Sequence, residues 1–220
     1  MVEELKKGVR SEGRQRGTKR VEKHFRILTT AFFLALTGAL GTIYWIPTFV
    51  KRLSGVSNQT VTSLLLVPAL LGFAGLLFNG WHSDTTCERH WHAAIPLLGS
   101  ALMFALVTLT SHEATFAVVF LLLGSGFLYA YYPAFWAIPT TMLGETTAAA
   151  TLALMNSIGQ IGGLAGPYMI GFLNDRTHSL VASFGLIALV YIAAGGLILS
   201  LKTRVPLSAT PVSALSNSHE

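Results

Sequence analysis

The apolar residues of the chain gather in six long stretches that contain no Asp, Glu, Lys, Arg or His. Each has the roughly 20 residues that an α-helix needs to cross a bilayer, and two are longer, which predicts tilt or extension beyond the lipid. None shows the alternating segments of about ten residues typical of membrane β-barrels. A helix satisfies its own backbone hydrogen bonds in lipid, so the pattern predicts an all-α, polytopic membrane protein with six transmembrane helices. The stretches are residues 27–50, 61–81, 93–111, 114–142, 146–174 and 179–201.

The composition supports a membrane environment and argues against an enzyme. Of 220 residues, 52% are hydrophobic and only 11% are charged, whereas a soluble domain carries about 25% charged residues. The single cysteine excludes an internal disulfide and any multi-cysteine metal framework. There is no Ser-His-Asp arrangement at depth, no Walker-type loop and no nucleotide-binding glycine motif after a strand, so we expect no catalysis and no cofactor.

The charged residues predict the domain boundaries and the orientation. Nine of the fifteen Lys and Arg precede residue 27, which favours a basic cytoplasmic tail or linker over residues 1–25 rather than a nucleic-acid-binding arm or a signal peptide. The six-helix bundle then covers residues 26–202, and a polar cytoplasmic tail covers 203–220. Six crossings place twelve Lys and Arg on one side and three on the other, so both termini are predicted to be cytoplasmic.

A short motif recurs at two places. Gly80-Trp-His-Ser-Asp84 ends the second stretch and Gly171-Phe-Leu-Asn-Asp175 ends the fifth. Both read Gly-aromatic-x-[Ser/Asn]-Asp, and six alternating crossings place them on opposite sides of the membrane. This is the trace that an inverted 3+3 repeat would leave.

Residues 80–92 are open to two interpretations. His82, Asp84, Cys87, His90 and His92 could ligate a metal, but the loop has no paired C-x-x-C and no second ligand cluster exists in the chain. We interpret it as a cytoplasmic turn and expect no metal. In that interpretation Gly80 allows close helix approach, Asp84 accepts backbone N–H groups at a helix start, and Arg89 anchors the loop.

These features resemble the major facilitator superfamily. A G-x-x-x-D motif at Gly80 and Asp84, followed by basic residues, is similar to the loop signature of that family, although Thr85 stands where the family usually has a basic residue. Three further segments resemble its anion:cation symporter branch, which includes tartrate, phthalate and galactonate permeases. They are residues 44–47 (YWIP), 133–139 (PAFWAIP) and 156–167 (NSIGQIGGLAGP).

The resemblance covers residues 26–202 as the C-terminal six-helix half of a twelve-helix transporter. It implies transport of a small organic anion, a carboxylate or sugar acid, with a co-transported cation, in practice a proton. Ionisable residues within the membrane are the usual carriers of such coupling, and the six stretches have none. The coupling carboxylate and substrate-binding arginine must then come from a separate N-terminal half. Two alternatives remain open: a truncated fragment without transport activity, and a six-helix membrane scaffold.

Candidate substrate-binding residues are neutral. Asn156 and Gln160 are spaced i, i+4 and share one helix face, where they could bind a substrate or hydrogen-bond another helix. Tyr129, Tyr132 and Trp136, at i, i+3 and i+7, could line a cavity, or belong to an aromatic belt or to packing, as could Tyr44. Small residues spaced by four predict close helix crossing and packing at Gly159, Gly162, Gly163 and Gly166.

Overall fold

The structure is a computed structural model that describes residues 2–142 and 145–201, with side chains described for 21–141 and 149–201. All regular elements of these residues are helices, and no strand occurs among them. The helices are α1 (Val2–Ser54), α2 (Asn58–Leu64), α3 (Leu66–Thr86), α4 (His90–Leu109), α5 (Ala114–Phe127), α6 (Tyr132–Met142), α7 (Glu145–Thr177) and α8 (Leu180–Leu199).

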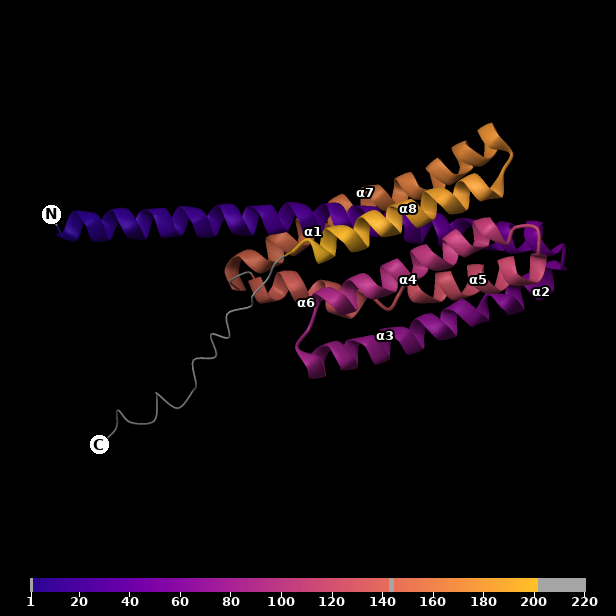
Figure 1. The fold of residues 1–220 in the computed structure, drawn as a ribbon, viewed down its shortest axis with the longest axis horizontal. Coiled ribbons are helices and arrows are strands. Elements are labelled where there is room, and N and C mark those ends of the chain that lie inside the picture. Colours follow the sequence, from indigo (N-terminus) through magenta and orange to yellow (C-terminus); the bar gives the residue numbers. More distant parts are fainter. Residues whose placement is uncertain (1, 143–144, 202–220) are drawn as a thin grey trace.

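The first helix is much longer than the apolar stretch that predicts it. α1 continues without interruption through the residues assigned to a basic tail, and its N-terminal half projects beyond the bundle (Figure 1). Glu22 and Arg26, one turn apart, form an exposed ion pair of 3.4 Å on this helix. Gly55 ends it with a positive φ of 68°, the left-handed conformation that glycine adopts without strain after a helix.

Two of the predicted helices are interrupted. Proline lacks an N–H and its ring clashes with the carbonyl four residues earlier. Pro68 therefore destabilises the helix at Leu64, where α2 ends before α3. Pro133 acts in the same way on Tyr129, in the irregular segment 128–131 between α5 and α6. Each interrupted pair still forms one candidate crossing, so the predicted spans over 61–81 and 114–142 are supported, although neither is one continuous helix.

α1 lies at the centre of the bundle. It packs along α7 and α8 and also touches α5, while α4 packs between α8 and α5, and α3 lies outside against α5 (Figure 1). Aromatic rings fill the space between α1, α4 and α8, where Phe49 lies 4.7 Å from Phe184 and Phe104 lies 6.0 Å from Tyr191, measured between ring centroids. These contacts define one helical bundle with a continuous apolar core.

Five segments of the described chain are long and apolar enough to cross a membrane, which confirms a polytopic membrane protein. They are Val21–Ser54, Asn58–Thr86, His90–Leu109, Ala114–Thr141 and Leu180–Leu199. α7 is not among them although it has 33 residues, because Asn156, Gln160 and a run of glycines dilute its apolar residues. α7 packs along α1 and is the sixth long helical segment of the bundle (Figure 1).

The bundle has two ends, which we name after one residue each. At the Arg89 end α3 is followed by α4 and α6 by α7, and at the Lys51 end α1 is followed by α2, α4 by α5 and α7 by α8 (Figure 1). Asp84 lies near the end of α3 and Asp175 near the end of α7. The two copies of the repeated motif therefore lie at opposite ends, as an inverted repeat requires.

Candidate substrate-binding surface

Glycines allow α1 and α7 to cross with their backbones in contact. A Cβ on Gly166 would meet the Thr37 carbonyl oxygen, with the Thr37 carbonyl carbon at 2.9 Å and the Gly41 nitrogen at 3.1 Å. A Cβ on Gly162 would meet the Phe33 carbonyl group in the same way. Backbone atoms cannot rotate away, so only glycine fits at these positions. We call this contact line the α1–α7 seam.

The two amides predicted to bind substrate lie beside the seam. Asn156 and Gln160 are both exposed on α7. A Cβ built on Gly163 would collide with Leu40 of α1. The same position lies 3.8 Å from the Gln160 amide oxygen, so the Gln160 amide lies close to α1. In the described part of the chain neither amide has a hydrogen-bond partner, so the expected alternative, a hydrogen bond to another helix of this bundle, does not occur there.

Tyr44 extends the same surface along α1. It follows Leu40 by one turn, its side chain is 69% exposed, and Thr48 and Lys51 continue its face of the helix. Trp45 turns toward α7, where its indole N–H donates a 3.0 Å hydrogen bond to the Pro167 carbonyl. The side of α1 next to the seam thus presents one phenol and one hydroxyl between the amides and the Lys51 end.

The predicted aromatic stripe does not lie on one continuous helix face. Tyr129 belongs to the irregular segment before α6, and a Cβ on Gly72 of α3 would collide with its ring. Tyr132 and Trp136 lie on α6, half-buried against Phe32 of α1, with ring centroids at 6.3 and 4.9 Å.

Phe32 joins these aromatic residues to α7. A Cβ on Gly159, between Asn156 and Gln160, would collide with the Phe32 ring. α6, α1 and α7 therefore meet at this ring, which Tyr132 and Trp136 also contact. Phe32 could not be predicted from the sequence, because nothing in its neighbourhood distinguishes it from other apolar residues of the first stretch.

The loop at the Arg89 end is held together by side chains of the loop itself. Arg89 donates to the Asp84 carboxylate and, at 3.1 Å, to the Ser83 hydroxyl. The Glu88 carboxylate accepts the Trp91 N–H at 2.9 Å and thereby caps α4. The expectation that Asp84 caps a helix start is therefore wrong. Glu88 accepts the N–H group at the start of α4, and Asp84 pairs with Arg89.

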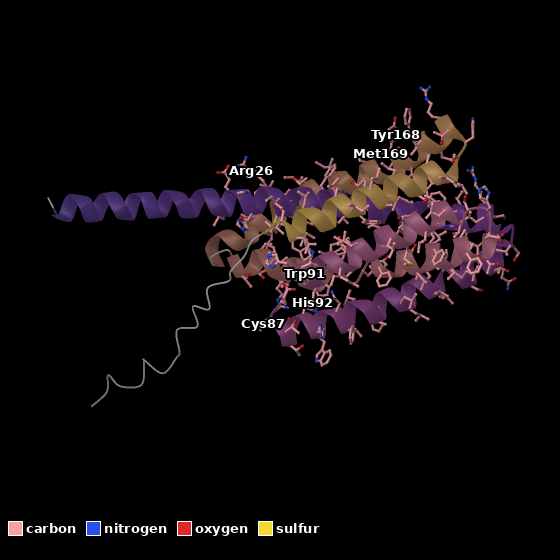
Figure 2. The ribbon with its side chains drawn as sticks, viewed as in Figure 1. Arg26, Cys87, Trp91, His92, Tyr168 and Met169 are labelled. Carbon is pink, nitrogen blue, oxygen red and sulfur yellow. The ribbon has the colours of Figure 1, made fainter. Side chains whose placement is uncertain are left out.

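The histidines of this loop contact one another. His82 Nδ1 lies 2.6 Å from His92 Nε2, and His92 Nδ1 lies 3.4 Å from Glu88. Cys87, Trp91 and His92 all lie at this end of the bundle (Figure 2). Gly80 lies against Pro133: a Cβ built on Gly80 would lie 3.2 Å from the Pro133 Cβ. α3 and α6 therefore approach closely here.

Asn79 is a second residue that the sequence analysis missed. Its amide nitrogen donates to the His92 carbonyl at 2.8 Å and to the Ala130 carbonyl at 2.6 Å. The second carbonyl lies in the break between α5 and α6, where an unpaired polar group in lipid would cost several kcal/mol. An asparagine in an otherwise apolar helix was the available signal for this role.

The apolar helical bundle with its long apolar crossings is the architecture of a polytopic membrane protein. The sequence pattern of the Major Facilitator Superfamily matches residues 3–167. The chain therefore belongs to this superfamily, which confirms the family resemblance found in the sequence.

Individual relatives are transport proteins of bacteria. The chain is 34% identical over 178 residues to a candidate metabolite transport protein, NicT, of Pseudomonas putida, covering 80% of this chain and 39% of that protein. It is 32% identical to a candidate tartrate transporter of Agrobacterium vitis, covering 83% and 40%. It is 31% identical to a quinolone resistance transporter of Acinetobacter baumannii, covering 79% and 40%. The chain thus spans about 40% of the length of these relatives.

Proposed function

We propose that this chain is one six-helix bundle of a secondary transporter that moves a small organic anion, a carboxylate or sugar acid, across the bacterial inner membrane. The observation that carries the proposal is the exposed polar surface beside the α1–α7 seam, with Asn156, Gln160 and Tyr44. An amide in contact with lipid is costly. This surface is therefore expected to face water, substrate or a second bundle.

The second bundle is proposed to be an N-terminal six-helix half. It would supply the arginine that pairs with the anion and the carboxylate that carries the coupled proton, because the apolar stretches of this chain hold no ionisable residue. The two bundles would rock about the site between them. The Arg89 end, with its tail, is proposed to face the cytoplasm.

The amides of Asn156 and Gln160 would donate hydrogen bonds to a substrate carboxylate or hydroxyl. Tyr44 would add a phenolic donor from α1, and Tyr132 and Trp136 would support Phe32 behind the amides. These neutral donors would orient the anion, while the arginine of the second bundle would pair with its charge.

The first test is the coding sequence of about 200 codons upstream of Met1. We expect it to encode six further helices, with an arginine and an acidic residue at membrane depth. Uptake of radiolabelled tartrate is then measured in cells that express this chain alone or together with that half. Only the pair is expected to take up tartrate, faster at low external pH, and a protonophore should abolish the pH effect.

Variants test the site within that assay. N156A and Q160A should each lower uptake about tenfold, the loss expected for about 1.4 kcal/mol of binding. S157A is the matched control, because Ser157 is exposed on the same helix. Its hydroxyl is already used, since it donates a 2.9 Å hydrogen bond to the Ala153 carbonyl of α7. Unchanged uptake in both amide variants would remove the proposed site. No uptake by the pair would leave a fragment or a membrane scaffold.

A further inference from the structure

A polar pocket lies at the Lys51 end of the bundle, outside the surface described above. Its volume is about 470 Å³, and it lies between the last turn of α1 and the short helix α2. Two cations line it from adjacent positions of α1, and the other polar residues of its wall are hydroxyls and an amide. The polar residues of its wall are Thr48, Lys51, Arg52, Asn58 and Thr62.

Both cations are oriented by neutral oxygens. Lys51 Nζ donates to the Asn58 amide oxygen, and Arg52 Nη1 donates to the Asn174 amide oxygen at 2.9 Å. Asn174 is buried on α7, so the arginine is fixed from a second helix. An amide oxygen holds a cation in place without cancelling its charge.

Among the residues whose side chains the structure describes, no carboxylate forms an ion pair with Lys51 or Arg52. The ion pairs found there involve Glu22, Asp84 and Glu88, which lie toward the Arg89 end. The other ionisable groups near the Lys51 end are the exposed His112, Glu113, Asp175, Arg176 and His178. Two like charges on neighbouring residues repel each other, and an anion placed between them would relieve that repulsion.

We propose that this pocket is a docking site for a small hydroxylated carboxylate. One carboxylate would lie between Lys51 and Arg52, and the Thr48 hydroxyl, which has no partner in the described part of the chain, would donate to a substrate oxygen. A planar guanidinium suits two-point contact with a carboxylate. The place of this site in transport rests on the proposed function, whereas binding of the anion does not.

The position of the pocket gives it a route to the seam. Tyr44, Thr48 and Lys51 are spaced i, i+4 and i+7, so they follow one face of α1 from the pocket toward Leu40 and Gln160. An anion docked at Lys51 would meet the Thr48 hydroxyl and the Tyr44 phenol on this face before it reaches Leu40 and the amides. The pocket would raise the local concentration of anions at the start of this path.

The experiment places a reporter thiol in the pocket of the full chain, purified in lipid nanodiscs. Cys87 is the only cysteine, so C87S removes the native thiol and T62C introduces one in the pocket wall. The Thr62 hydroxyl bonds the Asn58 carbonyl of its own helix and has no part in the proposed site. Reaction rates are compared for an anionic reagent (2-sulfonatoethyl methanethiosulfonate) and a cationic one (2-trimethylammonioethyl methanethiosulfonate) at low ionic strength.

The anionic reagent should react faster. A unit positive charge about 6 Å from the thiol in water speeds the anionic reagent about threefold and slows the cationic reagent about threefold. K51Q and R52Q should therefore each lower the ratio of anionic to cationic rate about tenfold. K51R should preserve the ratio. R176Q is the matched control, because Arg176 is also in a last helical turn but lies over the Phe172 ring, 5.4 Å from its centroid, outside the pocket wall.

Occupancy is measured with neutral N-ethylmaleimide. Tartrate should slow its reaction with T62C, whereas threitol, the uncharged tetrol with the same carbon skeleton, should not, and K51Q and R52Q should each remove the protection. Each variant must keep the melting temperature of its parent, and K51R keeps the test decisive if a glutamine variant does not fold. A rate ratio unchanged in K51Q and R52Q, or equal protection by threitol, would overturn the site.

The result separates this site from the proposed transport function. Protection by tartrate in a chain whose pair shows no uptake would keep the site and reject transport. Uptake by the pair without protection at Thr62 would keep transport and reject the site.

Discussion

At the Arg89 end, the buried Ser83 hydroxyl accepts a hydrogen bond from Arg89, and at the Lys51 end the buried Asn174 amide accepts one from Arg52. Ser83 and Asn174 occupy the same position of the repeated motif. The glycine that begins each copy, Gly80 or Gly171, lies against a neighbouring helix. The aspartate that follows differs in use. Asp84 pairs with Arg89, whereas Asp175 forms no ion pair within the described part of the chain.

The difference shows how one motif can serve two roles. A carboxylate beside the arginine neutralises it and fixes a turn, which suits a structural end of the bundle. An amide without that carboxylate orients the arginine and leaves its charge for a ligand. The two ends therefore share a framework of hydrogen bonds and differ in net charge.

The largest effect is expected from separating α1 from α7 at the seam. G166A places a methyl group against the backbone of Thr37 and Gly41, so we expect a loss of about 3 kcal/mol in the free energy of unfolding. G196A is the control, because no atom lies within 4 Å of a Cβ built there. Denaturation of both variants in detergent measures the difference. Equal stability would show that the backbones of α1 and α7 are not in contact.

A smaller effect should distinguish the two aspartates. D84N removes the partner of Arg89 and should cost about 0.5 to 1 kcal/mol, since the Asp84 side chain is 70% exposed and the pair is screened by solvent. D175N should leave stability unchanged. Denaturation at low and high salt provides the measurement, and the cost of D84N should shrink with salt. If D175N were the more harmful variant, the contrast between the ends would be reversed.

The smallest change in stability should come from making the Lys51 end like the Arg89 end. N58D gives Lys51 a carboxylate partner, so we expect a gain of up to about 0.5 kcal/mol in unfolding free energy. The same charge should weaken tartrate protection of T62C about threefold or more. Q59E adds an equal charge beside the pocket wall and serves as control. Full protection in N58D would mean that the charge of Lys51 does not bind the anion.

Much of the fold could be predicted from local sequence. Lipid requires long apolar helices, so charge-free stretches of sufficient length marked five crossings directly. Prolines 68 and 133 supplied the physical cause of both helix breaks, although their position alone did not predict where each helix would stop. α1 is the main exception, since a basic segment of Lys, Arg and Glu, all good helix formers, continues the helix.

The functional surface depended on contacts that local patterns do not encode. Trp45 with Pro167, and Arg52 with Asn174, are each separated by 122 positions. The glycine spacing predicted a close crossing but not that α1 would be the partner. Lys51 and Arg52 entered the sequence analysis only through their charges, because their shared pocket requires α2 and α7 to be placed around them.

The 53 residues of α1 also make a lever. At a rise of 1.5 Å per residue the helix is about 80 Å long, more than twice the hydrocarbon thickness of about 30 Å. A rotation of about 10° around its midpoint would swing each tip by about 7 Å, given that length. A spectroscopic label near the projecting tip would therefore report, from outside the membrane, small changes in tilt of the rod that carries Tyr44 and the Lys51 pocket (Figure 1).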